Sequence, residues 1–213
     1  MIYHKHDFII RKCKGKSVLH IGATDEPYHL KRFHNKSLLH LKLMNVSKKV
    51  IGLDYDKKSI KDLKKQGIEN IYFGDIVLNK YDKEIKKYNY DIIIFGDVIE
   101  HLNNPGTGLE NLKQFMDKNT ELILTTPNVW SIFRIKNFFK KAEINHPDHR
   151  FWPSLFTMKN IIEKQNFHIK NEGFLLAGSE KDNLTTLKGK LFKKIVVNRI
   201  QRWGTKLYFV LSR

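Results

Sequence analysis

Short runs of apolar and β-branched residues recur at a regular interval along the chain, with longer mixed stretches between them. Each run is almost wholly apolar, which is typical of strands in a parallel sheet that helices cover on both faces. The predicted strands are Ser17–Ile21, Val50–Leu53, Ile71–Phe73, Asp91–Phe95 and Glu121–Thr125.

The stretches between these strands have apolar residues at helical spacing. In Lys57–Gln66, Ile60 and Leu63 fall on one face, and Gly67 follows as a stop signal. We expect Thr157 to act as the cap of a further helix, which follows the last of these strands. The predicted helices are Lys57–Gln66, Gly108–Lys118 and Thr157–Gln165. Strands that alternate with helices indicate βαβ units and therefore an α/β fold with a mostly parallel sheet.

The C-terminal part breaks this alternation. His168–Ala177 and Lys206–Ser212 both have the pattern of strands, with a basic helical stretch around Leu187–Arg202 between them. A late pair of strands indicates an antiparallel edge on the parallel sheet.

Length and composition favour one domain over residues 1–213, because 41% hydrophobic residues are enough for a sizeable core. Within it we expect an N-terminal helical segment at about 1–15, and substrate-side or surface elaborations at about 127–157 and 180–204. The single cysteine, Cys13, excludes an internal disulfide framework and a cysteine-rich zinc site. No apolar run approaches the roughly 20 residues that span a bilayer, so we expect a soluble, cytoplasmic protein.

The charge is strongly basic, with 39 Lys and Arg against 22 Asp and Glu and a net charge of +17. Such a charge suits a polyanionic partner, but most of the lysines are spread along the chain and suit solvated faces. Two segments, Trp130–Ile144 and Leu187–Trp203, interleave basic and apolar residues as basic amphipathic helices do. They would pack on the sheet, or lie on an anionic membrane surface as peripheral contacts. Nucleic acid is a further partner that the charge permits, although no recognition motif supports it.

Acidic residues follow three of the predicted strands. Asp54, Asp75 and Asp97 are each one βα unit apart, so all three point to the same edge of the sheet. One such residue alone is better explained as a turn or capping residue. Three aspartates at the same position of successive βα units, beside the glycine turn at Gly22, favour a ligand site. A carboxylate beyond the second strand can accept hydrogen bonds from both hydroxyls of a ribose.

This succession of segments resembles the class I S-adenosylmethionine-dependent methyltransferases, and the resemblance runs from about Lys16 to the last strand. VLHIGATDEP stands at the glycine motif, VIGLDYD at the ribose motif and FGDI at the adenine motif, while GDVIEHL and ELILTTPN match the fourth and fifth motifs. The resemblance implies a Rossmann-like seven-stranded sheet in the order 3-2-1-4-5-7-6, with strand seven antiparallel and helices on both faces. The branch that modifies small molecules, including glycan and lipid precursors, is the most similar.

The family motifs also imply a cofactor, S-adenosyl-L-methionine, and a set of residues that bind it. His20 replaces the acid of the glycine motif, and Thr24 and Glu26 replace its later glycines. Glu26 would repel a phosphate, so a dinucleotide fits worse than a sulfonium with an ammonium group. The segment Phe33–Leu43 is longer than usual and predicts a longer helix or a lid. The implied cofactor-binding residues are His20, Gly22, Ala23, Thr24, Asp54, Tyr55, Asp75, Ile76 and Asp97.

An oxygen nucleophile needs a base that titrates near neutrality, and histidine suits this best. Two of the ten histidines are well placed: His101, after the fourth strand, and His149, in a loop after the fifth. A metal site of His146, Asp148 and His149 has no fixed helical spacing to support it, so we expect no metal. The fourth motif lacks the Asn/Asp-Pro-Pro-aromatic pattern of DNA base-amino methyltransferases, which excludes that activity.

The sequence thus predicts an S-adenosylmethionine-dependent methyltransferase that methylates an oxygen of a small molecule, a sugar or a lipid-linked glycan. An RNA methyltransferase is one alternative, and the charge favours it. A non-catalytic binding protein on a methyltransferase scaffold is the other, and the atypical glycine loop favours it. The acceptor, the methylated atom and the oligomeric state are left open.

Overall fold

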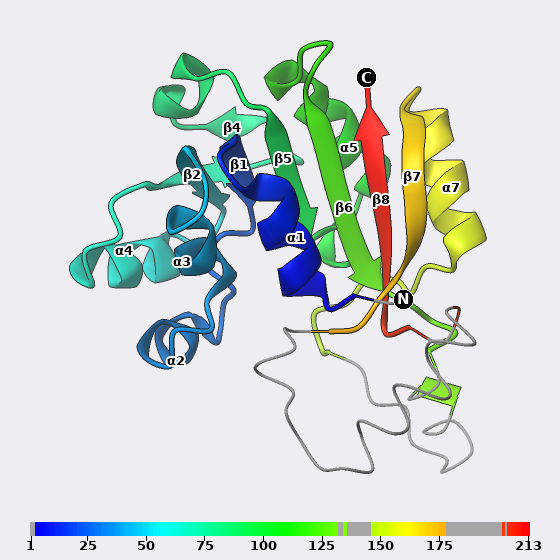
Figure 1. Cartoon of the computed structure of the whole chain (residues 1–213), viewed down its shortest axis with the longest axis horizontal. Helices are drawn as coiled ribbons and strands as arrows, with labels where there is room; N and C mark the ends of the chain where they lie inside the picture. Colours follow the sequence, from blue (N-terminus) through cyan, green and yellow to red (C-terminus); the bar gives the residue numbers. More distant parts are fainter. Residues whose placement is uncertain (1–2, 132–133, 136–145, 178–201, 203) are drawn as a thin grey trace.

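The computed structural model describes residues 3–131, 134–135, 146–177, 202 and 204–213. Its centre is an eight-stranded sheet in the order β4-β3-β2-β1-β5-β6-β8-β7 (Figure 1). The strands are β1 Ser17–Ile21, β2 Lys49–Asp54, β3 Ile71–Asp75, β4 Lys80–Tyr81, β5 Ile92–Gly96, β6 Glu121–Pro127, β7 His168–Leu175 and β8 Lys206–Ser212. Without β4, this is the predicted order 3-2-1-4-5-7-6, which is therefore confirmed.

The pairing directions also agree with the prediction. β1 runs parallel to β2 and to β5, with Val18 opposite Val50 and Ile92. β8 runs antiparallel to both β6 and β7. The sequence did not predict the two-residue β4, which pairs antiparallel with β3; the Asp82 carboxylate, directly after β4, accepts a hydrogen bond from the Phe73 N–H (3.2 Å).

Helices cover both faces of the sheet because alternate residues of each strand point to opposite sides. Leu19 packs in one cluster with Leu109 of α5 and Met158 of α7. Its neighbour Val18 packs in another cluster with Ile9 of α1, which crosses in front of the sheet in Figure 1. The α-helices are α1 Lys5–Cys13, α2 His29–His34, α3 Leu39–Met44, α4 Lys57–Lys65, α5 Pro105–Leu112 and α7 Leu155–Lys164, and the 3-10 helices are η1 Lys83–Lys87, η2 Ile99–His101 and η3 Lys113–Phe115.

Two helix predictions need correction. Instead of one longer helix, residues 33–34 end α2 and residues 39–43 lie in α3, and the link between the two helices contains a left-handed residue, Lys36 (φ 58°). The cap of α7 is Ser154 and not Thr157: the Ser154 hydroxyl accepts the hydrogen bond from the N–H of Thr157, which lies inside the first turn (3.1 Å).

The two predicted basic amphipathic helices, Trp130–Ile144 and Leu187–Trp203, lie largely outside the described residues, so they stay predictions. Among the helices that the structure does describe, none has the length and apolar character needed to cross a bilayer.

The α7 cap gives a first prediction. Replacing Ser154 by Ala leaves the Thr157 N–H without its acceptor, which should lower the free energy of unfolding by about 1 kcal/mol. Ser154→Thr keeps an acceptor oxygen and should lose less than half of that. Urea unfolding of both variants measures the difference, and equal losses would show that the hydroxyl does not cap the helix.

Candidate active site

A cavity of about 1250 Å³ opens at the carboxyl ends of β1, β2, β3 and β5. This is the edge where ligands bind in open α/β sheets. Every residue that the sequence singled out lines the cavity: His20, Gly22, Ala23, Thr24, Asp54, Tyr55, Asp75, Ile76, Asp97, His101 and His149. The fold therefore gathers the predicted residues around one space.

The loop after β1 turns on a single glycine. Gly22 has φ 72°, and a Cβ atom at this position would lie 2.5 Å from the Cγ2 atom of Val98. Its N–H donates to the Leu53 carbonyl oxygen (2.8 Å), which draws the loop toward β2. Only glycine meets both the left-handed backbone and the close approach.

The Asp54 carboxylate holds the rest of this loop. Its Oδ2 atom accepts hydrogen bonds from the Thr24 N–H (2.9 Å) and the Thr24 hydroxyl (2.8 Å), and its Oδ1 atom accepts one from the Asp56 N–H (3.1 Å). Burial raises the pKa of Asp54, although these hydrogen bonds favour the charged form. Thr24, at the position of the second glycine of the family motif, thus fastens the loop to β2 through its backbone and its side chain.

The residues after β3 shape the next side of the cavity. Asp75 Oδ1 accepts hydrogen bonds from the N–H groups of Val77 and Leu78 (2.9 Å each), so this aspartate also has the turn-forming role. Ile76 is buried, and its carbonyl oxygen accepts a hydrogen bond from Asn111 Nδ2 (2.7 Å). Tyr55, 65% exposed, stands at the rim.

His20 lies buried beside another histidine. Its ring stacks on that of His40 with centroids 5.5 Å apart, and the two Nδ1 atoms are 3.2 Å apart. Burial lowers the pKa of His20 well below its ordinary value, and burial likewise lowers the pKa of His40 to about 4. At neutral pH this position therefore holds an uncharged imidazole where the family has an acid.

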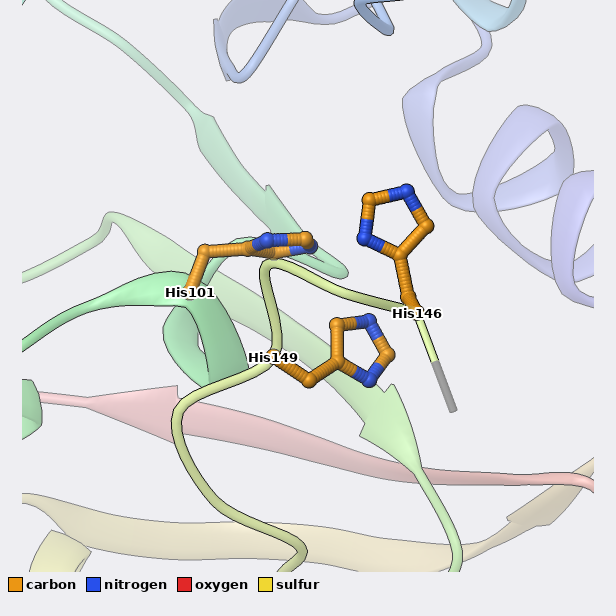
Figure 2. Close-up of side chains that lie close together, drawn as sticks. All are labelled: His101, His146 and His149. Atoms are coloured by element: carbon orange, nitrogen blue, oxygen red, sulfur yellow. The ribbon is translucent and has the colours of Figure 1, made fainter. Parts of the chain in front are cut away.

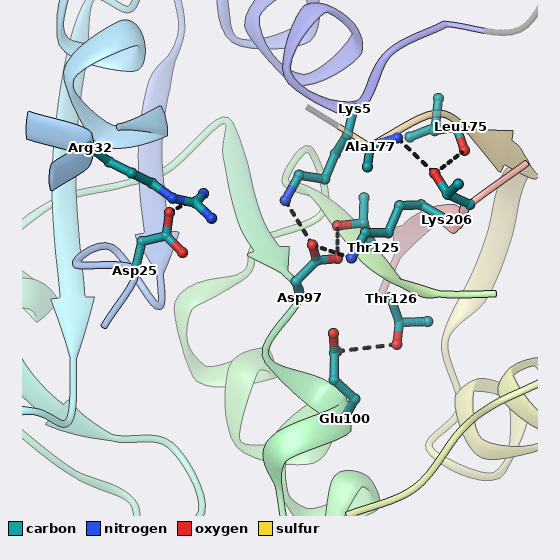
Figure 3. Close-up of polar contacts among 11 residues, drawn as sticks. Lys5, Asp25, Arg32, Asp97, Glu100, Thr125, Thr126, Leu175, Ala177 and Lys206 are labelled. Carbon is teal, nitrogen blue, oxygen red and sulfur yellow. Dashed lines mark hydrogen bonds and ion pairs between the residues drawn. The ribbon is translucent and has the colours of Figure 1, made fainter. Parts of the chain in front are cut away.

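Asp97 sits between two lysines at the end of β5 (Figure 3). Its Oδ2 atom is 2.8 Å from Lys5 Nζ of α1 and 2.6 Å from Lys206 Nζ of β8, and Oδ1 accepts a hydrogen bond from the Thr125 hydroxyl (3.2 Å). Burial by itself would raise the pKa of Asp97, but Lys206 and Lys5 together hold it well below the ordinary range. Nothing in the motifs pointed to these lysines, which lie at the two ends of the sequence.

Glu100 is a buried carboxyl on the floor of the same cavity. Its Oε2 atom accepts a hydrogen bond from the Thr126 hydroxyl (3.1 Å), whereas Oε1 has no partner among the described residues. Burial, together with the charge of Asp97, raises the pKa of Glu100 to about 8, so the carboxyl is largely protonated at neutral pH. Glu100 belongs to the segment GDVIEHL, which matches the fourth family motif, but the sequence did not show that this glutamate would be buried.

Three histidines meet in one part of the cavity, which we name the acceptor end for the role proposed for it (Figure 2). The Arg150 N–H donates to the Glu100 carbonyl oxygen (2.8 Å), and this bond brings the neighbouring residues His149 and His101 together with ring centroids 4.7 Å apart. His146 lies 5.5 Å from His101 by the same measure. The sequence placed His146 and His149 close to each other, but it did not place His101 against them.

His101 has a carboxylate partner, whereas the ring of His149 lies among His101, His146 and Trp152. The Nδ1 atom of His101 is 3.0 Å from Asp148 Oδ2. Burial lowers the pKa of His149 to about 4, and the neighbouring His101 adds to this, so His149 is uncharged at neutral pH. Of the two predicted bases, His101 is therefore the better oriented one.

The model of a protein family described as "Methyltransferase domain" matches residues 34–191. This match covers more than half of the chain. The chain belongs to the methyltransferase-domain family. S-adenosylmethionine is the cofactor of this family, and the prediction of a class I methyltransferase with a Rossmann-like fold is confirmed. A comparison with curated protein sequences finds no match.

Solved structures share the fold of this methyltransferase domain. The small RNA methyltransferase HEN1 superposes with a TM-score of 0.66 at 15% identity, over 98% of this chain but only 25% of that one. A SAM-dependent methyltransferase from Archaeoglobus fulgidus superposes with a TM-score of 0.57 at 16% identity, over 98% of this chain and 95% of that one. Magnesium protoporphyrin IX methyltransferase from Synechocystis, solved with bound SAH, has the same TM-score of 0.57 at 15% identity, over 98% of this chain and 81% of that one. At these identities the likeness concerns the fold alone.

The turn at Gly22 can be tested against a matched glycine. Gly22→Ala should lower the free energy of unfolding by about 1–3 kcal/mol. An alanine is strained at this positive φ, and its methyl group would also clash with the Val98 side chain. Gly15 has a similar φ of 69° but nothing within 4 Å of a Cβ position, so Gly15→Ala isolates the backbone contribution. Chemical denaturation should show the larger loss for Gly22→Ala, and equal losses would contradict the close approach.

Proposed function

We propose that this methyltransferase domain transfers a methyl group from S-adenosylmethionine to an oxygen of a small-molecule or glycan acceptor. The observation that carries the proposal is the convergence of Gly22, Asp54, Asp75 and His101 on one cavity. Bound S-adenosylmethionine would supply a methyl group on a sulfonium, which leaves as a neutral thioether.

The adenosine half of the cofactor fits the side of the cavity near β2 and β3. Asp54 Oδ1 accepts only one hydrogen bond in the structure, so it can accept another from a ribose hydroxyl. Asp75 uses Oδ1 for its turn, and among the described residues Oδ2 is left for the adenine amino group. Ile76 lines the same side and offers an apolar contact for the base.

The methionine half of the cofactor fits less simply at the part of the cavity that Lys5, Lys206 and Asp97 line. Asp97 is the acidic group there, but Lys5 and Lys206 already occupy its Oδ2 atom. The two cations leave this end with a net positive charge, which suits the carboxylate of the methionine half better than its ammonium group. We therefore expect Lys5 and Lys206 to bind that carboxylate, with Asp97 shared between them and the ammonium group.

At the acceptor end, His101 is placed to act as the base. Asp148 accepts a hydrogen bond from the Nδ1–H group, which leaves the lone pair of Nε2 for the proton of an acceptor hydroxyl. The oxygen can then attack the methyl carbon as the carbon–sulfur bond breaks, while the proton stays on His101. A positioned base of this kind contributes about 10²–10⁴-fold to a rate.

The RNA alternative is supported by a second, shallower groove of about 490 Å³. Four lysines of α4 line it together with Phe73 of β3: Lys57, Lys61, Lys64 and Lys65. Closely spaced cations beside an aromatic ring suit a phosphate backbone with stacked bases. We rank this function second, because the groove is separate from the cavity that holds the histidines and aspartates.

Calorimetric titration tests the donor site. The wild type should bind S-adenosylmethionine and its demethylated product at micromolar concentration. Asp54→Ala should weaken both by on the order of 100-fold, because it removes a charged acceptor from the ribose and frees the Thr24 loop. Thr24→Val removes only the hydroxyl bond and should weaken binding by less than roughly 10-fold.

No binding by the folded wild type would overturn the methyltransferase proposal and favour the non-catalytic scaffold. Circular dichroism on each variant separates lost binding from lost folding. Equal affinities of the wild type and Asp54→Ala would place the cofactor elsewhere.

Transfer of labelled methyl groups tests the acceptor end. With labelled S-adenosylmethionine and a cell extract, label should enter the small-molecule or glycan fraction. His101→Ala should slow that transfer by about 10²–10⁴-fold and leave cofactor affinity unchanged. His168→Ala, at an exposed position of β7, is the control and should keep the full rate. Label in the RNA fraction, lost in a Lys61→Glu/Lys64→Glu variant, would favour the RNA alternative instead.

A further inference from the structure

The three histidines at the acceptor end have the geometry of a metal site. One ring nitrogen from each of His101, His146 and His149 lies within 4.8 Å of the other two, and all three side chains are half-buried. They come from two separate elements, η2 and the loop before α7, and they border the same cavity (Figure 2). We propose that these three histidines bind a divalent transition-metal ion, with zinc as the type, at the acceptor end of the cavity.

Three imidazoles match what zinc takes in proteins. Zinc–nitrogen bonds of about 2.0–2.1 Å in a tetrahedral site place the ligand nitrogens roughly 3.4 Å apart, so small side-chain rotations from 4.8 Å would close the site. Three protein ligands leave a fourth position open, which is the arrangement of catalytic rather than structural zinc sites. Imidazole nitrogen also favours zinc, copper, iron and nickel over magnesium and calcium.

The surroundings of the rings support a ligand role. Asp148 Oδ2 lies 3.0 Å from His101 Nδ1, and a metal-bound histidine commonly donates its second N–H to such a carboxylate. His149 Nδ1 is buried and has no hydrogen-bond partner among the described residues, which is costly for a polar atom unless something binds it.

Three cations near the rings are each paired with another group, which reduces their repulsion of a bound metal ion; one of them is Arg150, whose Nη2 atom lies 3.2 Å from Asp148 Oδ1. Lys206 is paired with Asp97, and the guanidinium of Arg134 lies over the ring of Trp152 at 3.2 Å from its centroid. Asp148 contributes negative charge beside His101.

The catalytic role of the ion rests on the proposed function, whereas its binding does not. At the open position the ion would take up the acceptor oxygen and lower its pKa, so that the hydroxyl proton passes to water. The oxygen then forms the bond to the methyl carbon, and the electron pair of the broken carbon–sulfur bond stays on sulfur. In that case His101 acts as a ligand and the ion replaces it as the activating group.

Cobalt titration tests the site without a known acceptor. The full chain, free of any histidine tag and stripped with a chelator, is titrated with Co²⁺ and followed by visible absorption. We expect one ion per chain, absorption bands of a four- or five-coordinate site, and displacement by Zn²⁺. His146→Ala should weaken binding by on the order of 100-fold, and Asp148→Asn by about 10–100-fold. His34→Ala, at an exposed position of α2, should bind like the wild type.

The outcomes separate this proposal from the methyltransferase proposal. His146→Ala should keep wild-type affinity for S-adenosylmethionine, which shows that the chain is folded and the donor site intact. Absence of the visible bands in the wild type would overturn the metal site. So would an equal affinity in the wild type and in a His101→Ala/His146→Ala/His149→Ala variant, because the ion would then bind elsewhere.

Discussion

The hydrogen bonds between Asp54 and Thr24 are the contact on which the cofactor side of the molecule depends. The N–H groups of Gly22 and Ala23 hold the start of the loop on the Leu53 carbonyl oxygen, and Thr24 holds its continuation from a fully buried position. Because Asp54 ends β2 and Thr24 follows β1, the bond also fixes the two strand ends relative to each other. The proposed contact with the ribose and the support of the loop therefore both rest on one carboxylate.

A second constraint comes from the two ends of the chain. Lys5 opens α1 and Lys206 opens β8, and both meet Asp97 at the end of β5. The Lys5 N–H also donates to the carbonyl oxygen of Leu176, just beyond β7, which anchors the start of α1 there (2.7 Å). Asp97 has φ 58°, a conformation that a non-glycine residue keeps only where its surroundings hold it. Here the surroundings are the two lysines together with Thr125, whose carbonyl oxygen accepts a hydrogen bond from the Asp97 N–H (2.8 Å).

The acceptor end differs in character, because histidines provide its chemistry. The Arg150–Glu100 backbone bond connects the loop before α7 to η2, and it turns two distant sequence segments into one cluster. As free imidazoles the histidines offer a base with an orienting carboxylate. As metal ligands they offer an open coordination position. Both uses need the acceptor oxygen at the same place, beside the end of the cavity that Asp97 and Glu100 line.

The sequence by itself determined seven of the eight strands and the edge at which the site lies, and the resemblance to the family implied the order of those strands. Runs of apolar residues fix strands locally, and the phase of Asp54, Asp75 and Asp97 follows from one βα unit after another. The sequence motifs also indicated the family and its cofactor. Helix ends were less accurate, as at Ser154, because a cap depends on which hydroxyl reaches the first turn. Only the tertiary structure decided that Lys5 and Lys206 neutralise Asp97, that His20 is an uncharged partner of His40, and that His101 joins His146 and His149. These contacts join residues far apart in sequence, so no local pattern of residues encodes them. The pKa values of the side chains involved depend on their burial in the folded protein.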